Sequence, residues 1–113
     1  MKAAIGIEDL QIPETYTLSQ NYPNPFNPTT KISYTLPKSS YVTLTVYDLT
    51  GKEIAKLLDN TVANTGTNYV EWNGKDMKGR LAASGVYFYK IEARSMETGR
   101  TDFLNVKSMV LMK

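Results

Sequence analysis

The 113-residue sequence predicts an all-β fold, an immunoglobulin-like antiparallel β-sandwich of about seven strands. Short segments in which apolar and polar residues alternate recur along the chain, and this period of two is typical of half-buried strands. Turns rich in Gly, Asn and Asp separate these segments at fairly even intervals. Short strands with this spacing, and no convincing helix between them, are typical of a β-sandwich.

The predicted strands differ in how clearly they show an inward face. We expect strands at residues 15–19, 31–36, 41–47, 52–58, 68–72, 86–93 and 101–112, with a loop at 59–67. The clearest inward residues are Ile32, Tyr34, Leu36, Val42, Leu44, Val46, Val70, Trp72, Tyr87, Tyr89 and Ile91, whereas Tyr41, Thr43, Thr45 and Tyr47 face outward.

Two segments allow more than one interpretation. Residues 52–58 also fit helical spacing, but seven residues are few for a helix, so we expect a strand with Ile54 and either Leu57 or Leu58 inward. In the last strand we expect a bulge around Asn105. There we expect Met109 and Leu111 to face inward, in preference to the neighbouring positions.

Composition excludes several classes of function. The chain is 42% hydrophobic and 21% charged, which suits one globular domain. With no cysteine or histidine, it has no disulfide, thiolate nucleophile, Cys/His zinc site or imidazole base. The net charge of +2 is small and the basic residues are scattered, which argues against a nucleic-acid or anionic-membrane surface. No apolar run is long enough for a membrane span.

The first 14 residues read as a tail or linker, and residues 15–113 as the folded domain. The amino-terminal residues are too short and too acidic for a signal peptide. If the protein is exported, we expect its signal to lie outside this chain, which would then be a fragment of a larger precursor.

A stretch at residues 20–30 contains three prolines within six residues, so it can be neither a helix nor a central strand. The side chains of Asn21, Asn24 and Asn27 can close local turns onto the backbone. Tyr22 and Phe26 are the large side chains of this otherwise polar segment. We expect a rigid lead-in to the next strand, held on the core by these two aromatic rings.

Five motifs occur in order and carry a family resemblance. They are Q-N-Y-P-N-P-F-N-P at 20–28, Y-D-L-T-G-K at 47–52, W-N-G-K-D-M-K-G at 72–79, S-G-V-Y-F-Y at 84–89 and a final strand ending in lysine. In this order they resemble the type A C-terminal sorting domain of the Por (type IX) secretion system, which is similar to the immunoglobulin-like domain of flagellar hook-capping proteins. The residues of these motifs to which we assign a structural role are Asn21, Pro23, Asn24, Pro25, Phe26, Asn27, Pro28, Asp48, Gly51, Trp72, Gly74, Asp76, Gly79, Gly85, Tyr87 and Tyr89.

The resemblance implies a non-catalytic module without a cofactor or metal. It implies that an upstream cargo domain is carried through the periplasm and outer membrane to the cell surface. The implied partners are the outer-membrane secretion machinery and a sortase, with cleavage before Pro13. The residues expected to be recognised are Lys107, Met109, Val110, Leu111 and Lys113.

Other interpretations remain open. The aromatic residues Tyr22, Phe26, Trp72, Tyr87 and Tyr89 form either a sugar-stacking platform or, as we favour, part of the core. Asp48, Asn73 and Asp76 either bind calcium or, as we favour, form turns. Glu53, Glu71 and Glu92 lack the apolar pocket that a glycosidase pair needs. Lys107 and Lys113 can also act only as protection of an edge strand. The alternative function is an accessory β-sandwich of a secreted hydrolase that binds carbohydrate or a neighbouring domain.

Overall fold

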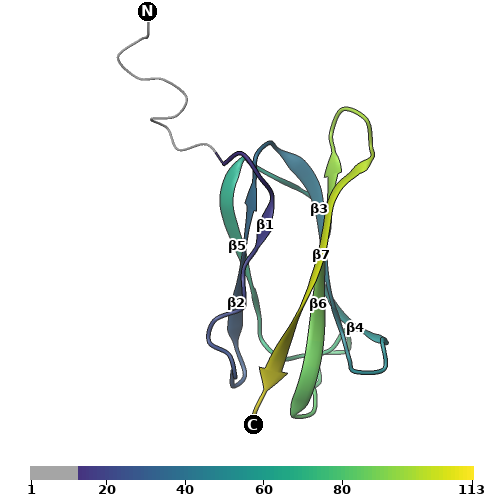
Figure 1. The fold of residues 1–113 in the computed structure, drawn as a ribbon. Coiled ribbons are helices and arrows are strands. Elements are labelled where there is room, and N and C mark those ends of the chain that lie inside the picture. Colours follow the sequence, from purple (N-terminus) through teal and green to yellow (C-terminus); the bar gives the residue numbers. More distant parts are fainter. Residues whose placement is uncertain (1–12) are drawn as a thin grey trace, which may run out of the picture.

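The computed structural model describes residues 13–113, which form two antiparallel sheets packed face to face (Figure 1). The predicted tail and cleavage region before Pro13 lie outside the described residues. The three-stranded sheet has the order β1–β2–β5 and the four-stranded sheet the order β4–β3–β6–β7. The strands are β1 (Thr17–Leu18), β2 (Thr30–Leu36), β3 (Ser40–Tyr47), β4 (Glu53–Ala63), β5 (Gly66–Trp72), β6 (Gly85–Ser95) and β7 (Thr101–Leu111). The predicted seven-stranded immunoglobulin-like sandwich is confirmed.

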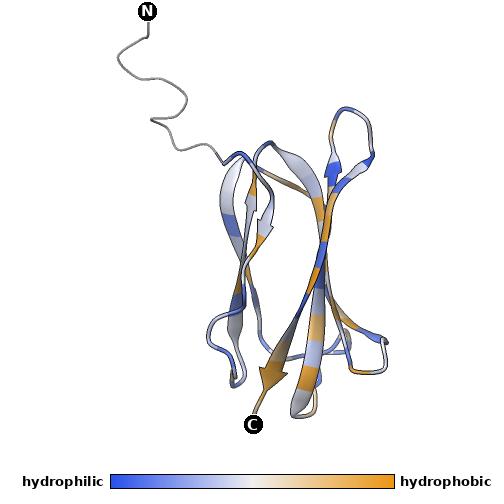
Figure 2. Cartoon of the chain, viewed as in Figure 1, coloured by the Kyte–Doolittle hydropathy of each residue, from blue (hydrophilic) through white to orange (hydrophobic). Residues whose placement is uncertain are grey.

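The core lies between the sheets and is built from the alternate residues that the sequence pattern indicated (Figure 2). The predicted inward residues of β2, β3 and β6 are all buried. In β7 the inward residues are Met109 and Leu111, which are 0% and 1% exposed, as predicted. One expected outward residue, Thr45, is also buried, because β3 lies between β4 and β6.

The fourth strand is longer than predicted. β4 continues to Ala63, so the loop expected at 59–67 is wrong, and only two residues separate β4 from β5. The extension pairs with β3 through irregular register, and Asn60 adopts a positive φ of 51° within it. This irregularity shifts the faces of the strand. As a result Ala55 and Ala63 are the buried residues, while the predicted Ile54, Leu57 and Leu58 are half-buried at the edge of the core.

The bulge predicted around Asn105 is also misplaced. Asn105 pairs in regular register with Ile91. The irregularity lies further along the strands, between Ala93 and Arg94 of β6. The strand at β1 is limited to two residues instead of five. Within residues 13–113, no helix has the length and hydropathy that crossing a membrane requires.

Candidate functional site: the motif end of the sandwich

The five sequence motifs lie together at one end of the sandwich, where β7 finishes (Figure 1). This end, which we call the motif end, comprises the proline stretch (20–30), the turn at 48–52, the loop at 73–84 and residues 109–113. The chain reverses direction between sheets here, so segments far apart in sequence come into contact.

An aromatic cluster joins three of the motifs. The ring of Phe26 is 2% exposed and its centroid lies 5.7 Å from that of Trp72. Trp72 in turn meets Tyr87 edge-on at 5.5 Å. Tilted and edge-on pairs of this kind are favourable beyond their buried area. Phe26 is therefore the core anchor that we predicted for the proline stretch.

The second predicted anchor is wrong, because Tyr22 is 80% exposed. Its backbone pairs with that of Lys31 through two hydrogen bonds of 2.9 Å. Residues directly opposite each other in an antiparallel pair point to the same face. Ile32 points into the core, so Lys31 and its partner Tyr22 point to solvent.

Of the five aromatic residues in the alternative platform, Phe26, Trp72, Tyr87 and Tyr89 are buried. They are part of the core, as we favoured. The alternative of a sugar-stacking platform made of these five residues is therefore not formed.

A buried polar network fixes the start of the proline stretch. Asn21 is 2% exposed, and its amide donates to Thr30 Oγ1 at 3.0 Å and to the carbonyl of Pro23 at 3.2 Å. The backbone N–H of Asn21 donates to the hydroxyl of Tyr89, which donates to the carbonyl of Ser19 at 2.7 Å. Burial raises the pKa of Tyr89 to about 12, so this hydroxyl stays protonated and can donate.

The proline stretch covers the last part of the edge of β7. The N–H of Phe26 donates to the carbonyl of Val110, and its carbonyl accepts from the N–H of Met112, both at 2.9 Å. The side chain of Asn24 accepts from the N–H of Val110 at 2.9 Å. Gln20 reaches the carbonyl of Ser108 at 2.7 Å. The last residues of β7 therefore do not present a free strand edge.

Asn24 thus makes a long-range bond to β7 in place of the predicted local turn. Pro25 and Asn27 are exposed, and among the hydrogen bonds of residues 13–113 the side chain of Asn27 makes none. The structure confirms local turn formation only for Asn21, whose amide reaches the carbonyl of Pro23.

Two turns at the motif end have the same construction. In the first, Asp48 Oδ1 accepts from the N–H groups of Thr50 and Lys52 at 2.9 and 3.0 Å. In the second, Asp76 Oδ1 accepts from the N–H groups of Lys78 and Arg80 at the same distances. The fourth residue of each turn is a glycine, with φ of 89° at position 51 and 80° at position 79. The chain therefore contains one five-residue turn, D-x-x-G-[KR], used twice.

The hydrogen bonds in these turns lower the pKa of both aspartates. For Asp48 the largest effect is the hydroxyl of Thr50, and for Asp76 it is the N–H of Arg80. Both carboxyls therefore stay ionised at neutral pH. Asn73 forms a similar local turn, accepting from the N–H of Lys75 at 3.1 Å. The turn-forming role that we favoured for these three residues is confirmed.

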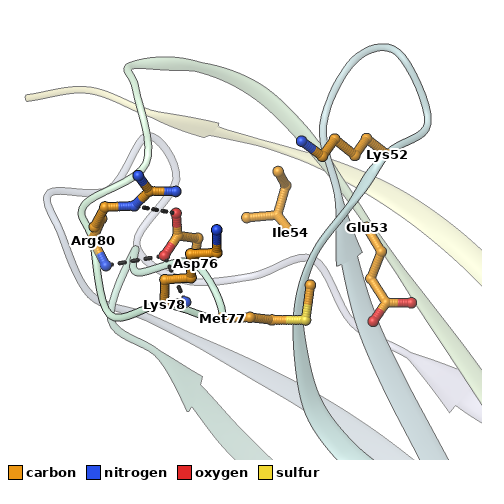
Figure 3. Close-up of a pocket in the computed structure, with 7 residues that line it drawn as sticks. All are labelled: Lys52, Glu53, Ile54, Asp76, Met77, Lys78 and Arg80. Carbon is orange, nitrogen blue, oxygen red and sulfur yellow. Dashed lines mark hydrogen bonds and ion pairs between the residues drawn. The ribbon is translucent and has the colours of Figure 1, made fainter.

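A shallow pocket of about 150 Å³ lies between the second turn and the start of β4 (Figure 3). Two of its charged groups are paired with each other, since Asp76 Oδ2 lies 3.4 Å from Arg80 Nε. The residues lining it are Lys52, Glu53, Ile54, Asp76, Met77, Lys78 and Arg80. Elsewhere, Glu71 is exposed on β5, and Glu92 on β6 accepts from Thr101 at 2.8 Å. Across the described residues, no three carboxylates gather closely enough to hold a metal ion.

The loop at 73–84 is locked against the proline stretch. Gly74 has a φ of 76°, and a Cβ atom added there would lie 2.9 Å from the carbonyl oxygen of Pro28. Only glycine fits such a close approach with a positive φ. The indole N–H of Trp72 donates to the carbonyl of Lys75 at 2.9 Å, and Tyr87 donates to the carbonyl of Ala83 at 2.6 Å. Gly85, with φ of 152°, then opens β6.

The predicted recognition residues are in different environments. Met109 and Leu111 are part of the core, whereas Lys107 and Val110 are half-buried. Lys113 is exposed, and its backbone N–H donates to Ser84 Oγ at 3.0 Å. Two surface residues were missed. Leu49 and Met77 are 69% and 64% exposed, each directly after the aspartate of its turn. The repeated D-x-x-G-[KR] spacing was the signal that could have found them.

Comparison with known proteins agrees with this architecture. The chain forms an immunoglobulin-like β-sandwich, and the family described as the FlgD Ig-like domain matches residues 21–97. The chain therefore belongs to the FlgD Ig-like domain family. A search of curated protein sequences gave no significant match.

Solved structures of the same fold include FlgD from P. aeruginosa, at 24% identity with a TM-score of 0.60, covering 77% of this chain and 70% of that one. Dimeric latent PorU from Porphyromonas gingivalis is 17% identical with a TM-score of 0.67, covering 88% of this chain and 10% of PorU. PorZ, a surface component of the type IX secretion system of the same organism, is 19% identical with a TM-score of 0.50, covering 83% of this chain and 11% of PorZ. At these identities the likeness concerns the fold, and the chain corresponds to only about a tenth of PorU and PorZ.

Proposed function

We propose that this chain is a C-terminal sorting module of type A, which directs an attached cargo protein through the type IX (Por) secretion system to the cell surface. One observation carries the proposal. The five motifs that resemble this class of sorting domain are not spread over the sandwich but contact one another at the motif end. The fold shared with segments of PorU and PorZ supports the same class, since PorZ is a component of that system.

The proposal includes the absence of catalysis. Two of the acidic side chains at the motif end, Asp48 and Asp76, are committed to turns, and depressed pKa values keep them ionised. The pocket between the second turn and the start of β4 is shallow and carries the opposing charges of Lys52, Glu53 and Arg80. A sorting role needs only a rigid, recognisable surface, which this end provides. The proposed partners are the outer-membrane secretion machinery and a sortase.

A reporter fusion tests the proposal. A protein with a Sec signal and this chain at its carboxyl end should reach the surface of a bacterium that has the type IX system, and remain in the periplasm of a mutant without it. Protease accessibility of the reporter on whole cells measures the difference. A reporter that stays in the periplasm of both strains, although the domain is folded, would refute the sorting function.

A second reporter tests whether the carboxyl end of the domain is the part that is recognised. A short flexible Gly/Ser extension after Lys113 leaves the core contacts of Met109 and Leu111 in place and should barely change stability. The matched control carries the same insertion in the turn at Thr98 and Gly99, at the opposite end of the sandwich. We expect the extended reporter to fold but remain in the periplasm, and the control to reach the surface. Equal export of both would place recognition away from the terminus.

A further inference from the structure

The repeated turn displays an apolar side chain twice. Leu49 and Met77 follow the aspartates of their turns and are 69% and 64% exposed. Leu81 and Met112, also at the motif end, are each 55% exposed. Single exposed apolar residues are common on protein surfaces and need no explanation. Here, however, the same position of the same turn is exposed in both copies.

The turns hold these side chains outward. In each, the aspartate carboxylate binds the N–H groups two and four residues ahead, which fixes the backbone on both sides of the apolar residue. The second turn is also fastened to β4, because the N–H of Met77 donates to the carbonyl of Ile54 at 3.0 Å. Little backbone conformational entropy is therefore left to lose when Leu49 or Met77 becomes buried by a partner.

Basic residues are frequent at the motif end. They are scattered in the sequence, but the fold gathers several of them here, which the sequence pattern did not indicate. The exposed cations at the motif end are Lys52, Lys75, Lys78, Arg80 and Lys113. The acidic groups there are Asp48, Glu53 and Asp76, and the two aspartates are turned towards the N–H groups of their own turns. Arg80 is paired with Asp76 at 3.4 Å, and the five cations against three carboxylates leave the motif end with a net charge of +2.

We propose that the motif end docks on the surface of an anionic phospholipid bilayer, with Leu49 and Met77 entering the headgroup region and the lysines of the motif end contacting lipid phosphates. The pattern of residues favours a bilayer over a protein. The core of a protein interface is a contiguous apolar patch in which lysine is depleted. The motif end instead presents separate apolar side chains on turn tips among lysines, whose long apolar stems suit the water–lipid boundary.

Vesicle flotation with the full chain tests this. The probe is a vesicle of 70% phosphatidylcholine and 30% phosphatidylglycerol, compared with pure phosphatidylcholine. We expect binding only to the anionic vesicle, weakened by high salt because the Debye length shortens. Each lysine near the surface contributes about a fivefold increase in binding. Equal binding to both vesicles, or to neither, would overturn the proposal.

A matched pair of double variants tests the residues. Leu49→Glu with Met77→Glu should lower vesicle binding at least tenfold, since both apolar contacts are lost and two negative charges added. The control, Val62→Glu with Val106→Glu, changes the net charge equally at 54% and 48% exposed positions on the sheet away from these turns, and should retain binding within about threefold. Similar losses in the two variants would show that only net charge matters and would contradict the docking site.

Two further measurements keep the result clear. If circular dichroism shows that the glutamate variant is unfolded, Leu49→Ser with Met77→Ser replaces it and should still lower binding, because the lost contacts are the same. Binding to poly-glutamate without binding to anionic vesicles would show an acidic protein to be the partner and overturn the proposal. No part of this test needs a secretion system, so it succeeds or fails independently of the sorting function.

Discussion

Removing the ring of Phe26 is the most direct test of how the motif end is built. This side chain is 2% exposed, and the centroid of its ring lies 5.7 Å from that of Trp72. The backbone N–H and carbonyl of the same residue bind Val110 and Met112 at the end of β7. The change to alanine leaves those backbone bonds possible while it opens a cavity under the proline stretch. The perturbation therefore isolates the packing contribution from the hydrogen bonds.

Truncation of a buried phenylalanine costs about 3 to 5 kcal/mol. We expect a value within this range, since the favourable tilted contact with Trp72 is lost together with the buried area. In a domain of this size, 1 kcal/mol shifts Tm by roughly 4 to 8 °C. Phe26→Ala should therefore lower Tm by more than about 12 °C. Urea unfolding followed by tryptophan fluorescence measures the free energy directly, because Trp72 is the single tryptophan.

The control lies in the same stretch. Tyr22→Ala removes an aromatic ring that is 80% exposed and should change the free energy of unfolding by less than about 0.5 kcal/mol. If the two variants are equally stable, the packing described for Phe26 is wrong. An unchanged urea slope in Phe26→Ala would further show that the effect is on the folded domain rather than on the compactness of the unfolded chain.

Three further outcomes follow from the same end of the molecule. Asn24→Ala should destabilise by about 1 kcal/mol in urea unfolding, because a backbone N–H of β7 loses its acceptor. Gly74→Ala should lower Tm clearly more than Gly99→Ala. Both glycines have a φ near 75°, but only a Cβ at Gly74 would lie 2.9 Å from a carbonyl oxygen. Equal losses of Tm would contradict the close approach at Gly74. The depressed pKa values of Asp48 and Asp76 contribute stability that is present above pH 4 and is lost as the pH falls below it. Changing both residues to Asn should therefore weaken the dependence of Tm on pH in this acidic range.

Much of the fold follows from the alternation of side chains along the chain. The inward faces of β2, β3 and β6 were predictable because Ile, Val, Leu and Tyr recur there every second residue. The inward phase of the last strand, carried by Met109 and Leu111, followed in the same way. These segments are flanked by turns whose Asp and Gly residues leave few other conformations open.

The errors arise where alternation breaks or where burial depends on a distant partner. β4 was cut short because Asp59, Asn60 and Thr61 read as a loop, whereas the strand continues through a register shift at Asp59 and Asn60 and pairs with β3 again at Thr61. Tyr22 was taken as buried because aromatic residues usually are, but its pairing with Lys31 sets its face. No local pattern specifies such long-range register, so the sequence alone did not decide these two points.

The contact between the proline stretch and β7 changes what the chain terminus can present. Val110 and Met112 have their outward backbone groups bound by Phe26 and Asn24, so a partner cannot add a strand there unless the proline stretch is displaced. Further up β7, Lys107 is half-buried on the same side as Met109, and an inward-pointing charge of this kind disfavours pairing with another chain. Under the proposed sorting function, a partner that binds the motif end would therefore contact side chains, chiefly the exposed Met112 and Lys113 together with the turns beside them.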